Sequence, residues 1–491
     1  MPGIFGFTHH QRNDNNFHLL ENMANALIDG ENYQDFQHHE ELISLGRVGT
    51  RYFQPDTQPA WNQNECVAVI LEGEVYDYAD HQNELIRRGY QFKSNSHAEL
   101  FAHLYDEFGP EFVKNINGAF STAIWDKIRH ELFLITDHLG LQPLYYSSFT
   151  KNGLIFASGV RSILAHKDIP RKIDHLALAQ LLTFDHALDD HTLLDDIKLL
   201  PGGTILSFAN NQLTFQNYWR PQYPSHYPVR SYAEYYEEFG PIIKRAVKRQ
   251  IPEEESAAVL MSGGLDSRVV VGFLHDHLVN GNLQTITMGQ PSCDDERFAK
   301  DVSRALGVPH TFYQLKGDYL LNYAERGVRI SDGMGNIVHM HTLPVVNKHH
   351  LSARIFYKGF LGDALIGYGI DERHFAKYSD SDISDAQFAI HKDQGLILFT
   401  PETLDKLMMT QDVEPISQRV RASYSNSFKA ANTDSPADQR NYFDLCQRVP
   451  RMTLNGVLWV RSQVPVRLPF AERLWGSMRY RTSVWSVPRT L

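Results

Sequence analysis

Cysteine is scarce in this sequence of 491 residues. Its three cysteines, Cys66, Cys293 and Cys446, lie far apart and form no Cys-x-x-Cys pair. A disulfide framework or a structural zinc site needs several cysteines at characteristic short spacings. The sequence therefore predicts neither kind of site, and we expect three reduced thiols.

Long apolar runs and an excess of basic residues are also missing. No stretch of the sequence approaches the roughly 18 consecutive apolar residues of a membrane-spanning helix. The first residues lack the basic and apolar regions of a signal peptide. The formal net charge of −11 is spread along the chain, without the basic patch that binds nucleic acid. We therefore expect a cytoplasmic protein that binds neither membranes nor nucleic acid.

The most informative motif that is present is a phosphate-binding loop. A strand-like apolar run, Ala257–Met261, leads into Ser262–Ser267, which reads Ser-Gly-Gly-Leu-Asp-Ser, and a helical apolar pattern follows from Val269. Two glycines let backbone N–H groups surround an anion, and the serine hydroxyls and the helix N-terminus add further attraction. Asp266 can hold Mg²⁺ beside the phosphates. An ordinary strand-to-helix turn is the alternative, because Gly-Gly before Asp-Ser also favours turns and helix caps.

The length of the chain suits two or three domains of about 150 residues. The first third mixes strand-like runs with helical patterns, which predicts a layered α+β sandwich. The segment Tyr218–Tyr227 carries two prolines and no usable period, which marks a linker. After it, strands and helices alternate, which predicts an α/β domain whose parallel sheet binds ligands at the carboxyl ends of its strands. The runs in the first third are strand-like at 67–71, 120–125 and 131–136, and helical at 17–27 and 98–108.

Several motifs in the same order along the chain resemble those of one family. Gly73–Tyr76, Asn117–Phe120 and Asp137–Tyr146 are similar to segments of the glutamine-hydrolysing asparagine synthetases. Leu199–Gly203 and Tyr218-Trp219 resemble the landmarks that join the two domains of that family. The loop at 262–267 resembles the pyrophosphate loop, or PP-loop, of the ATP pyrophosphatases, which cleave ATP between its α and β phosphates. The family includes β-lactam synthetases and lasso-peptide cyclase-like members.

The resemblance implies a fold for each half of the chain. Residues 1–217 are expected to form an Ntn-hydrolase-like sandwich of the glutamine amidotransferase type 2 kind, followed by a linker at 218–235. Residues 236–472 are expected to form the α/β ATP-pyrophosphatase domain, which is adenine nucleotide α-hydrolase-like. The arginine-rich end, 473–491, departs from the family pattern, so a truncated or frame-altered end is expected.

The resemblance also implies a site for ATP and Mg²⁺. Asp266 and Asp363 are expected to be the catalytic residues and to hold the metal, although Asp363 could instead cap a helix that starts at Ala364. The residues expected to bind the nucleotide or its pyrophosphate are Leu260, Ser262, Gly263, Gly264, Asp266, Ser267, Met288 and Gly359.

The glutaminase pocket departs from the family at three positions. Members that hydrolyse glutamine expose an N-terminal cysteine as the nucleophile, whereas this chain has Pro2. Glu72 stands where the family has asparagine, and His97 stands where it has aspartate, while Gly73 and Glu74 keep the pattern. We therefore expect an inactive glutaminase. A wrongly assigned start is the alternative for Pro2, but it leaves Glu72 and His97 unexplained.

A further departure affects the synthetase half. Phe360 stands where the family has a glutamate, and phenylalanine cannot accept a proton. Tyr368 and Asp332 are candidates to act as the base in its place, unless the amine arrives neutral. Family members also continue beyond the likeness that ends near Phe470, and that segment supplies a lysine that neutralises charge on the intermediate.

These features predict an ATP-dependent ligase that adenylates a carboxylate, releases pyrophosphate and forms an amide with a nitrogen nucleophile. The carboxylate can be a small molecule or a peptide. The nitrogen can come from free ammonia, from glutamine or from an internal amine, and a homodimer is left open. Two alternatives remain: an intramolecular cyclase of a peptide or β-lactam pathway, and a degenerate scaffold that only binds nucleotide.

Overall fold

The computed structural model divides the chain into two compact units. The N-terminal unit comprises Met1–Asp174, Asp190–Arg220 and Val328–Met334, and the C-terminal unit comprises His175–Asp189, Pro221–Gly327 and Gly335–Leu491. Each unit is described by itself below. The structure describes residues 1–9, 14–30, 33–50, 53–148, 153–225, 231–251, 256–278, 282–349, 352–366, 383–393, 395, 397–408 and 414–472.

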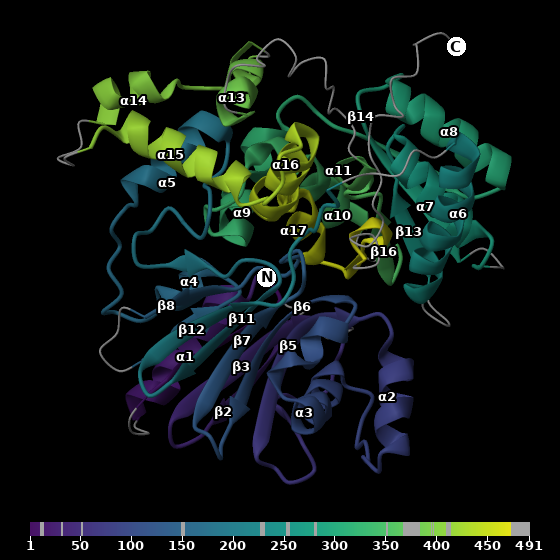
Figure 1. The fold of residues 1–491 in the computed structure, drawn as a ribbon. Helices are drawn as coiled ribbons and strands as arrows, with labels where there is room; N and C mark the ends of the chain where they lie inside the picture. Colours follow the sequence, from purple (N-terminus) through teal and green to yellow (C-terminus); the bar gives the residue numbers. More distant parts are fainter. Residues whose placement is uncertain are drawn as a thin grey trace. The chain divides into compact units, whose positions relative to one another are not determined.

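Two antiparallel six-stranded sheets form the frame of the N-terminal unit (Figure 1). The first sheet has the order β10 (Lys198–Leu199), β8 (Tyr145–Ser147), β9 (Ile155–Ala157), β1 (Gly3–Thr8), β3 (Ile43–Thr50) and β2 (Tyr33–His39). The second has the order β12 (Gln212–Asn217), β11 (Thr204–Ala209), β7 (Glu131–Thr136), β6 (Gly118–Asp126), β5 (Val67–Val75) and β4 (Ala60–Trp61).

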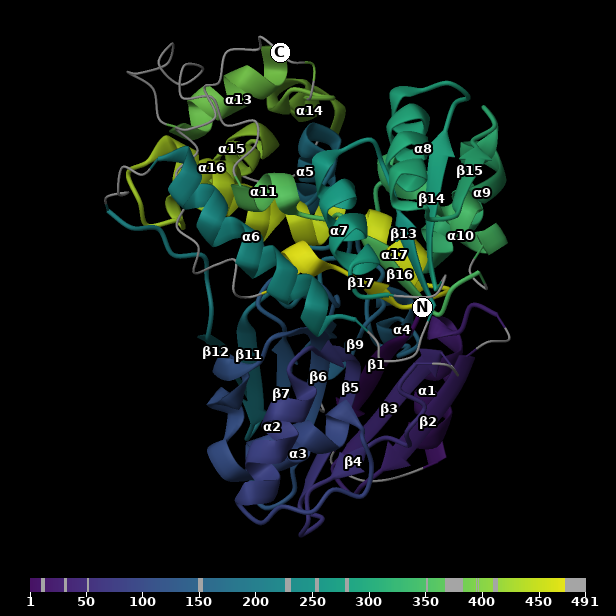
Figure 2. The same ribbon diagram turned by 90° about the vertical axis from the view of Figure 1, so that its right-hand side faces the viewer.

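Helices cover the outer face of each sheet. Helix α1 contacts β1 and β3 of the first sheet, and α3 contacts β5 of the second (Figure 2). Separate apolar clusters fill the spaces between α1 and the first sheet, between the two sheets, and between the second sheet and α3. The predicted α+β sandwich is confirmed, with four layers. The helical elements of this unit are α1 (Asp14–Leu27), α2 (Tyr78–Arg87), α3 (His97–Phe108), α4 (Val160–Ile163) and the 3₁₀-helix η1 (Pro110–Asn115).

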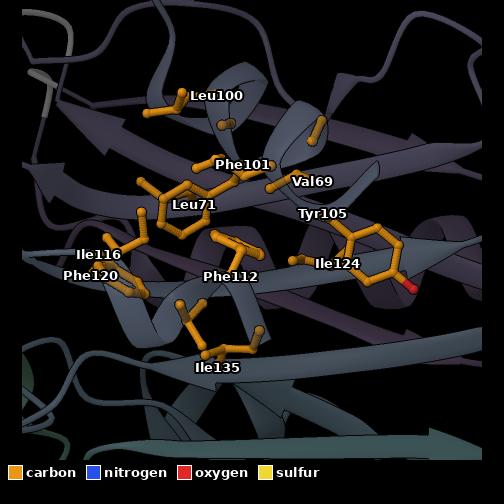
Figure 3. Packing of buried hydrophobic residues seen from close by; sticks show 14 of the residues in the cluster. Val69, Leu71, Leu100, Phe101, Tyr105, Phe112, Ile116, Phe120, Ile124 and Ile135 are labelled. Atoms are coloured by element: carbon orange, nitrogen blue, oxygen red, sulfur yellow. The ribbon is translucent and has the colours of Figure 1, made fainter. Parts of the chain in front are cut away.

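Strand β5 shows why this region is apolar without a break. Val69 and Leu71 face α3 and pack with Phe101 and its neighbours (Figure 3), whereas Ala68 and Ile70 face the other sheet. A strand buried on both faces loses the alternation of apolar and polar residues that a half-exposed strand shows. The next residues on the inner face, Glu72 and Glu74, are also buried and therefore need polar partners.

A parallel five-stranded sheet forms the centre of the C-terminal unit, as the alternation of strands and helices predicts. The chain starts at the central strand and winds outward twice, first to one edge and later to the other. The point where the winding reverses lies between β13 and β16. The order is β15 (His310–Gln314), β14 (Leu283–Gly289), β13 (Ala257–Leu260), β16 (Ile355–Lys358) and β17 (Val466–Arg467).

Helices pack around this sheet, and α6 and α7 lie side by side in both views (Figures 1 and 2). Helix α6 starts with a capping box of Ser231 and Glu234, inside the segment that the sequence marks as linker. The helices of this unit are α5 (His175–Phe184), α6 (Tyr232–Arg249), α7 (Leu265–His275), α8 (Asp294–Leu306), α9 (Tyr319–Ser331, whose last residues belong to the N-terminal unit), η2 (Ile337–Thr342), α10 (Leu343–His349), α11 (Gly362–Ile366), α13 (Ile383–Asp393), α14 (Pro401–Met408), α15 (Ile416–Lys429), α16 (Pro436–Phe443), the π-helix η3 (Asp444–Thr453), α17 (Asn455–Arg461) and η4 (Pro469–Ala471).

A second core lies away from the sheet. It consists of aromatic and aliphatic side chains from α5 and from the helices α13 to α16. The rings of Tyr424, Phe428 and Phe443 contact one another at centroid distances of 4.6 to 5.1 Å. Within the described residues, no helix combines the length and the apolar character needed to cross a membrane.

Candidate functional site

The Ser262–Ser267 loop lies at the carboxyl edge of the parallel sheet. It follows the central strand β13, and the segment Gly359–Asp363 follows the neighbouring strand β16. Parallel strands end at the same edge, so the two segments lie beside each other where the winding of the sheet reverses. Ligands of open α/β sheets bind at such a reversal point.

Helix α7 begins directly at the loop. Its first residue is Leu265, with Gly264 as the N-cap, so the helix starts earlier than the apolar pattern from Val269 indicates. The first turn combines an exposed leucine, Leu265, with polar residues, which hides it from a search for apolar periodicity. The free N–H groups and the dipole of this turn point at the loop, which favours an anion there.

The two serines close the loop on itself. Ser267 is buried, and its hydroxyl donates to the carbonyl oxygen of Ser262 at 3.0 Å. The backbone N–H of Ser262 donates to the hydroxyl of Ser267 at 3.2 Å, and the N–H of Gly264 reaches the hydroxyl of Ser262 at 3.3 Å. These bonds hold the loop in a curved form, and Ser262 itself is exposed.

Asp295 is a loop partner that the sequence analysis does not identify. This residue lies in the first turn of α8, and its carboxylate accepts a hydrogen bond from the N–H of Gly263 at 2.6 Å. One of the glycine N–H groups expected to bind phosphate therefore binds an anionic group in this structure. The run of three acidic residues at 294–296 is the only sequence signal for it, and helix starts often carry such runs.

The structure brings Asp266 against the segment 359–363. The N–H groups of Gly362 and Asp363 donate to its carboxylate, and a Cβ on Gly362 would overlap that carboxylate. Burial and the neighbouring charge of Asp363 raise the pKa of Asp266 to about 6. Two carboxylates that raise each other's energy in this way favour a bound cation between them.

Asp363 itself is exposed and lies in the first turn of α11. Its carboxylate accepts a hydrogen bond from the N–H of Ala364 at 2.8 Å. Helix α11 starts at Gly362, so Asp363 stands inside its first turn and not at the N-cap position before Ala364. The contact with Ala364 occupies one oxygen of the carboxylate.

The three residues expected to shape the nucleotide pocket come from neighbouring strand ends. Leu260 is the last residue of β13 and is buried, and Met288 lies near the end of β14 and is half-buried. Gly359 follows β16, and a Cβ there would lie 2.5 Å from the N atom of Ser267. The close approach of the two segments therefore requires glycine at this position.

Lys358 is another residue that the sequence analysis does not identify. It ends β16 and pairs in register with Leu260. Its ammonium group donates to the carbonyl oxygen of Gly456 at 3.1 Å, beside the ring of His339. The sequence signal for Lys358 is its place directly after the apolar run Ile355–Tyr357. A lysine seldom ends a buried strand unless its charge has a partner.

The sequence offers Asp332 and Tyr368 as bases in place of the family glutamate. Asp332 belongs to the N-terminal unit, where Arg161 binds its carboxylate through both the guanidinium and the backbone N–H. That carboxylate is therefore occupied. Tyr368 lies outside the described residues. Phe360 is buried, so an apolar side chain stands directly after Lys358-Gly359 at the sheet edge.

The residues that the sequence analysis assigns to a degenerate glutaminase pocket lie in the N-terminal unit. Pro2 is half-buried and stands directly before β1. Glu72 of β5 forms a buried ion pair with Arg47 of β3, with 3.0 Å between its Oε2 and the Nε of Arg47. Arg47 also donates to the carbonyl oxygen of Gln54 at 2.8 Å. Arg47 follows Ile43 and Leu45 on the inner face of β3, so its strand alternation aims it at Glu72.

The rest of this pocket is also occupied by contacts within the unit. The Nδ1 atom of His97 accepts a hydrogen bond from the N–H of Val75 at 2.9 Å, and its ring stacks on Tyr78 with 4.8 Å between centroids. Glu74 is buried on the inner face of β5. Gly73 has φ 108°, and a Cβ there would overlap the carbonyl oxygen of Ala119, so this position requires glycine.

Asp137, which opens one of the family-like motifs, has a structural role. Its buried carboxylate accepts hydrogen bonds from the N–H groups of Phe120, Leu139 and Leu141 at 2.9 to 3.1 Å. Three N–H donors compensate a buried carboxylate well. Asp137 therefore stabilises the sandwich.

Comparison with protein families agrees with this division of the chain. Residues 1–219 match the glutamine amidotransferase domain family, and residues 238–473 match the asparagine synthase family. The two matches together cover nearly all of the chain, in the order that the sequence motifs indicate.

Individual relatives are moderately similar. Asparagine synthetase [glutamine-hydrolyzing] 2 of Bacillus subtilis is 29% identical over 343 residues, which cover 65% of this chain and 45% of the relative. Amidase chyE of Penicillium rubens is 24% identical over 410 residues, which cover 77% and 59%. The solved glutamine phosphoribosylpyrophosphate amidotransferase of B. subtilis covers 65% of this chain and 67% of its own, at 14% identity and a TM-score of 0.31. The chain spans about half the length of the first curated relatives it matches.

Proposed function

We propose that this chain, which belongs to the asparagine synthetase family, is an ATP-dependent ligase that activates a carboxylate as an acyl-adenylate and joins it to a nitrogen nucleophile. The observation that carries this proposal is the meeting of the Ser262–Ser267 loop with the segment Gly359–Asp363 at the reversal point of the sheet. A PP-loop alone is compatible with an ordinary turn. An ordinary turn would not need the neighbouring carboxylates of Asp266 and Asp363 or the close contacts at Gly359 and Gly362.

In the proposed site, each group has a role that its position supports. The loop N–H groups and the start of α7 bind the pyrophosphate portion of ATP, because they present donors and a positive dipole end. Leu260, Met288 and Gly359 line the adenosine portion. The carboxylate of Asp295 leaves the N–H of Gly263 when a phosphate oxygen arrives, because two anions compete for one donor.

The carboxylates of Asp266 and Asp363 fit Mg²⁺, which prefers oxygen ligands and often uses one or two carboxylates together with phosphate oxygens. Within the described residues, no group of three or more His, Cys, Asp or Glu side chains could hold a metal. The remaining ligands of a bound Mg²⁺ would be phosphate oxygens and water. When bound, Mg²⁺ would supply charge neutralisation for the phosphates. The protein contributes the alignment of the reactants, which can lower a barrier by about 7 to 11 kcal/mol.

We also propose that residues 1–217 form a domain without glutaminase activity, joined by 218–235 to a synthetase domain at 236–472. Pro2 offers no nucleophile, and the polar groups of Glu72 and His97 are bound to Arg47 and to the backbone of Val75. An arriving glutamine would have to displace these partners. The nitrogen nucleophile is therefore free ammonia or an amine of the substrate.

ATP–pyrophosphate exchange tests the adenylation proposal. The full chain is incubated with ATP, Mg²⁺ and labelled pyrophosphate, with aspartate and a panel of other carboxylates offered one at a time. Exchange with any one of them requires a reversible adenylation step. Absence of exchange across the panel, together with normal ATP binding, supports the alternative of a nucleotide-binding scaffold.

A second candidate function is an intramolecular cyclase, in which one substrate carries both the carboxylate and the amine. Phe360 favours it, since the β-lactam synthetases that the sequence resembles also lack the family glutamate at this position. Product formation without added ammonia identifies this function. Glutamate release from glutamine by the purified chain would contradict the proposal of an inactive glutaminase.

A further inference from the structure

Lys358 lies at the carboxyl edge of the sheet, next to the proposed nucleotide site. It is the residue directly before Gly359, and it pairs in register with Leu260 of the neighbouring strand β13. The residue before it, Tyr357, points to the opposite face of the sheet, where its hydroxyl binds the carbonyl oxygen of Gln250 after α6. Lys358 therefore points to the face that carries α17 and η2.

The charge of Lys358 has no anionic partner among the residues that the structure describes. Its ammonium group donates to the neutral carbonyl oxygen of Gly456, and no carboxylate of the described chain acts on it. The groups whose charges act on the neighbouring His339 of η2 are Lys358 itself, His341 of η2 and Arg448 of η3, and none of them is an anion. The Nε2 of His339 has no hydrogen-bond partner within the described residues.

Such an arrangement is costly unless an anion completes it. Taking an ammonium group out of water without a counter-charge disfavours its charged form, and burial lowers the pKa of Lys358 to about 8. The same burial also lowers the pKa of His339, to about 4, with the charge of Lys358 as a further cause. A packed, positively charged corner that lies one residue from the nucleotide segment is suited to bind a negatively charged oxygen.

We propose that Lys358 binds an oxygen of the nucleotide α-phosphate, the group that is retained in AMP and in the acyl-adenylate. This inference rests on the proposed function, because it places the nucleotide at the reversal point of the sheet. The loop and the two aspartates serve the pyrophosphate side, and Lys358 approaches from the α17 side. The lysine thereby neutralises the part of the nucleotide that the loop does not reach.

Equilibrium binding to the full chain tests this role without knowledge of the carboxylate. AMP and adenosine are titrated into the wild type and the Lys358→Met variant in a calorimeter. The variant is expected to bind AMP at least tenfold more weakly and adenosine unchanged, while Lys358→Arg retains most of the AMP affinity. Lys406→Met, an exposed lysine of α14, is the matched control and is expected to bind both like the wild type.

Proton uptake provides a readout that loss of packing does not produce. Because the pKa of Lys358 is about 8, an anion that binds it at pH 8 draws in up to about half a proton. Titrations of AMP in two buffers of different ionisation enthalpy measure this uptake, which is expected in the wild type and absent in Lys358→Met.

The outcomes separate the two proposals. Equal AMP affinity and equal proton uptake in the wild type and in Lys358→Met would overturn the role of Lys358 and leave the ligase proposal standing. If the wild type binds neither ATP with Mg²⁺ nor AMP, the proposed function itself fails. Should Lys358→Met not fold, as judged by its far-UV circular dichroism, Lys358→Gln takes its place in both measurements.

Discussion

The two units of this protein arrange their charged and polar groups in opposite ways. In the N-terminal unit, Glu72 pairs with Arg47 and His97 accepts from the backbone of Val75, so these polar groups are satisfied within the unit. In the C-terminal unit, Asp266 lies near the like charge of Asp363, and Lys358 donates to a neutral carbonyl and has no anionic partner among the described residues. The first arrangement is closed and stable. The second would be completed by the ligands of opposite charge that we propose.

This difference shows how a site can be recognised when a motif is ambiguous. Polar groups that satisfy each other contribute to stability, and nothing is gained by binding a ligand there. Like charges held close together, or a buried charge without a counter-charge, oppose folding and are retained where binding or chemistry uses them.

The largest effect is expected from breaking the closed pair. Glu72→Ala leaves the guanidinium of Arg47 buried without its carboxylate, and we expect this to destabilise the N-terminal unit by about 3 to 5 kcal/mol. Hydrogen exchange of β3 and β5 in increasing urea measures the loss. The double variant Arg47→Met/Glu72→Met, which removes both charges, is expected to be within about 1 kcal/mol of the wild type.

A surface pair provides the matched control for this experiment. Glu84 binds Arg87 and Arg88 on α2 in an exposed position. Glu84→Ala is expected to change stability far less than Glu72→Ala, because solvent screens exposed ion pairs. A cost for Glu72→Ala as small as that for Glu84→Ala would contradict the view that the pocket is held closed by this pair.

Next in size is the loss of activity from Asp266→Asn. An amide cannot replace the carboxylate charge that holds a metal against phosphate, so exchange of pyrophosphate into ATP is expected to fall by about 10² to 10³-fold. Asp276→Asn, at the exposed far end of the same helix, is the control and is expected to leave exchange unchanged. Exchange at the wild-type rate in Asp266→Asn would sink the proposed site.

A smaller, opposite effect of the same substitution is expected on stability. The pKa of Asp266 is raised to about 6, above its ordinary value of 3.8, so the folded chain binds this proton more tightly than the unfolded chain. The carboxylate is therefore unfavourable above pH 6, and its cost fades as the pH falls toward 4. Without metal or nucleotide, Asp266→Asn is expected to be more stable than the wild type by about 1.5 kcal/mol at pH 7.5, since partial exposure screens part of the shift.

Thermal unfolding in a chelating buffer at pH 7.5 and at pH 4 measures this difference. The stability difference between Asp266→Asn and the wild type is expected to disappear at the lower pH, where both folded proteins carry a neutral side chain at this position. A gap that stays the same at both pH values would mean that packing, and not charge, separates the two proteins.

The smallest effect is expected from His97→Ala, which removes the acceptor of the Val75 N–H and the stacking on Tyr78. We expect the free energy of unfolding of the N-terminal unit to fall by about 1 kcal/mol. The hydrogen-exchange experiment described for Glu72→Ala measures this change. His97→Asn retains an acceptor near the backbone and is expected to recover part of the loss. Glutamine hydrolysis is expected in none of these variants, since each retains Pro2.

Much of the fold could be predicted from local patterns. The apolar run at 67–71 and the strand pair at 120–136 could be identified without a structure, because strands that are buried on both faces carry long, mostly apolar runs. The start of α7 could not, because its first turn combines an exposed leucine with polar residues and is formed by the loop itself. Helix starts that bind ligands lack the apolar period that marks the rest of the helix.

The candidate site could be predicted only in part. Ser262–Ser267 and Asp363 stand in recognisable motifs, but Asp295, Lys358 and Arg47 do not. Each of these three acts on a group that is distant along the chain, on Gly263, Gly456 and Glu72 respectively. Spacing in a sequence carries information about neighbours on one element, and these contacts join separate elements.

The sequence by itself determined the order of the two domains, the strand–loop–helix unit around Asp266 and the presence at position 2 of a proline without a nucleophilic side chain, because side-chain type and local spacing decide these features. Only the tertiary structure decided which charges are satisfied. Whether a carboxylate meets an arginine, as Glu72 does, or another carboxylate, as Asp266 does, depends on which strand ends the fold brings together. Electrostatic energy depends on distance in space, and distance along the chain does not report it.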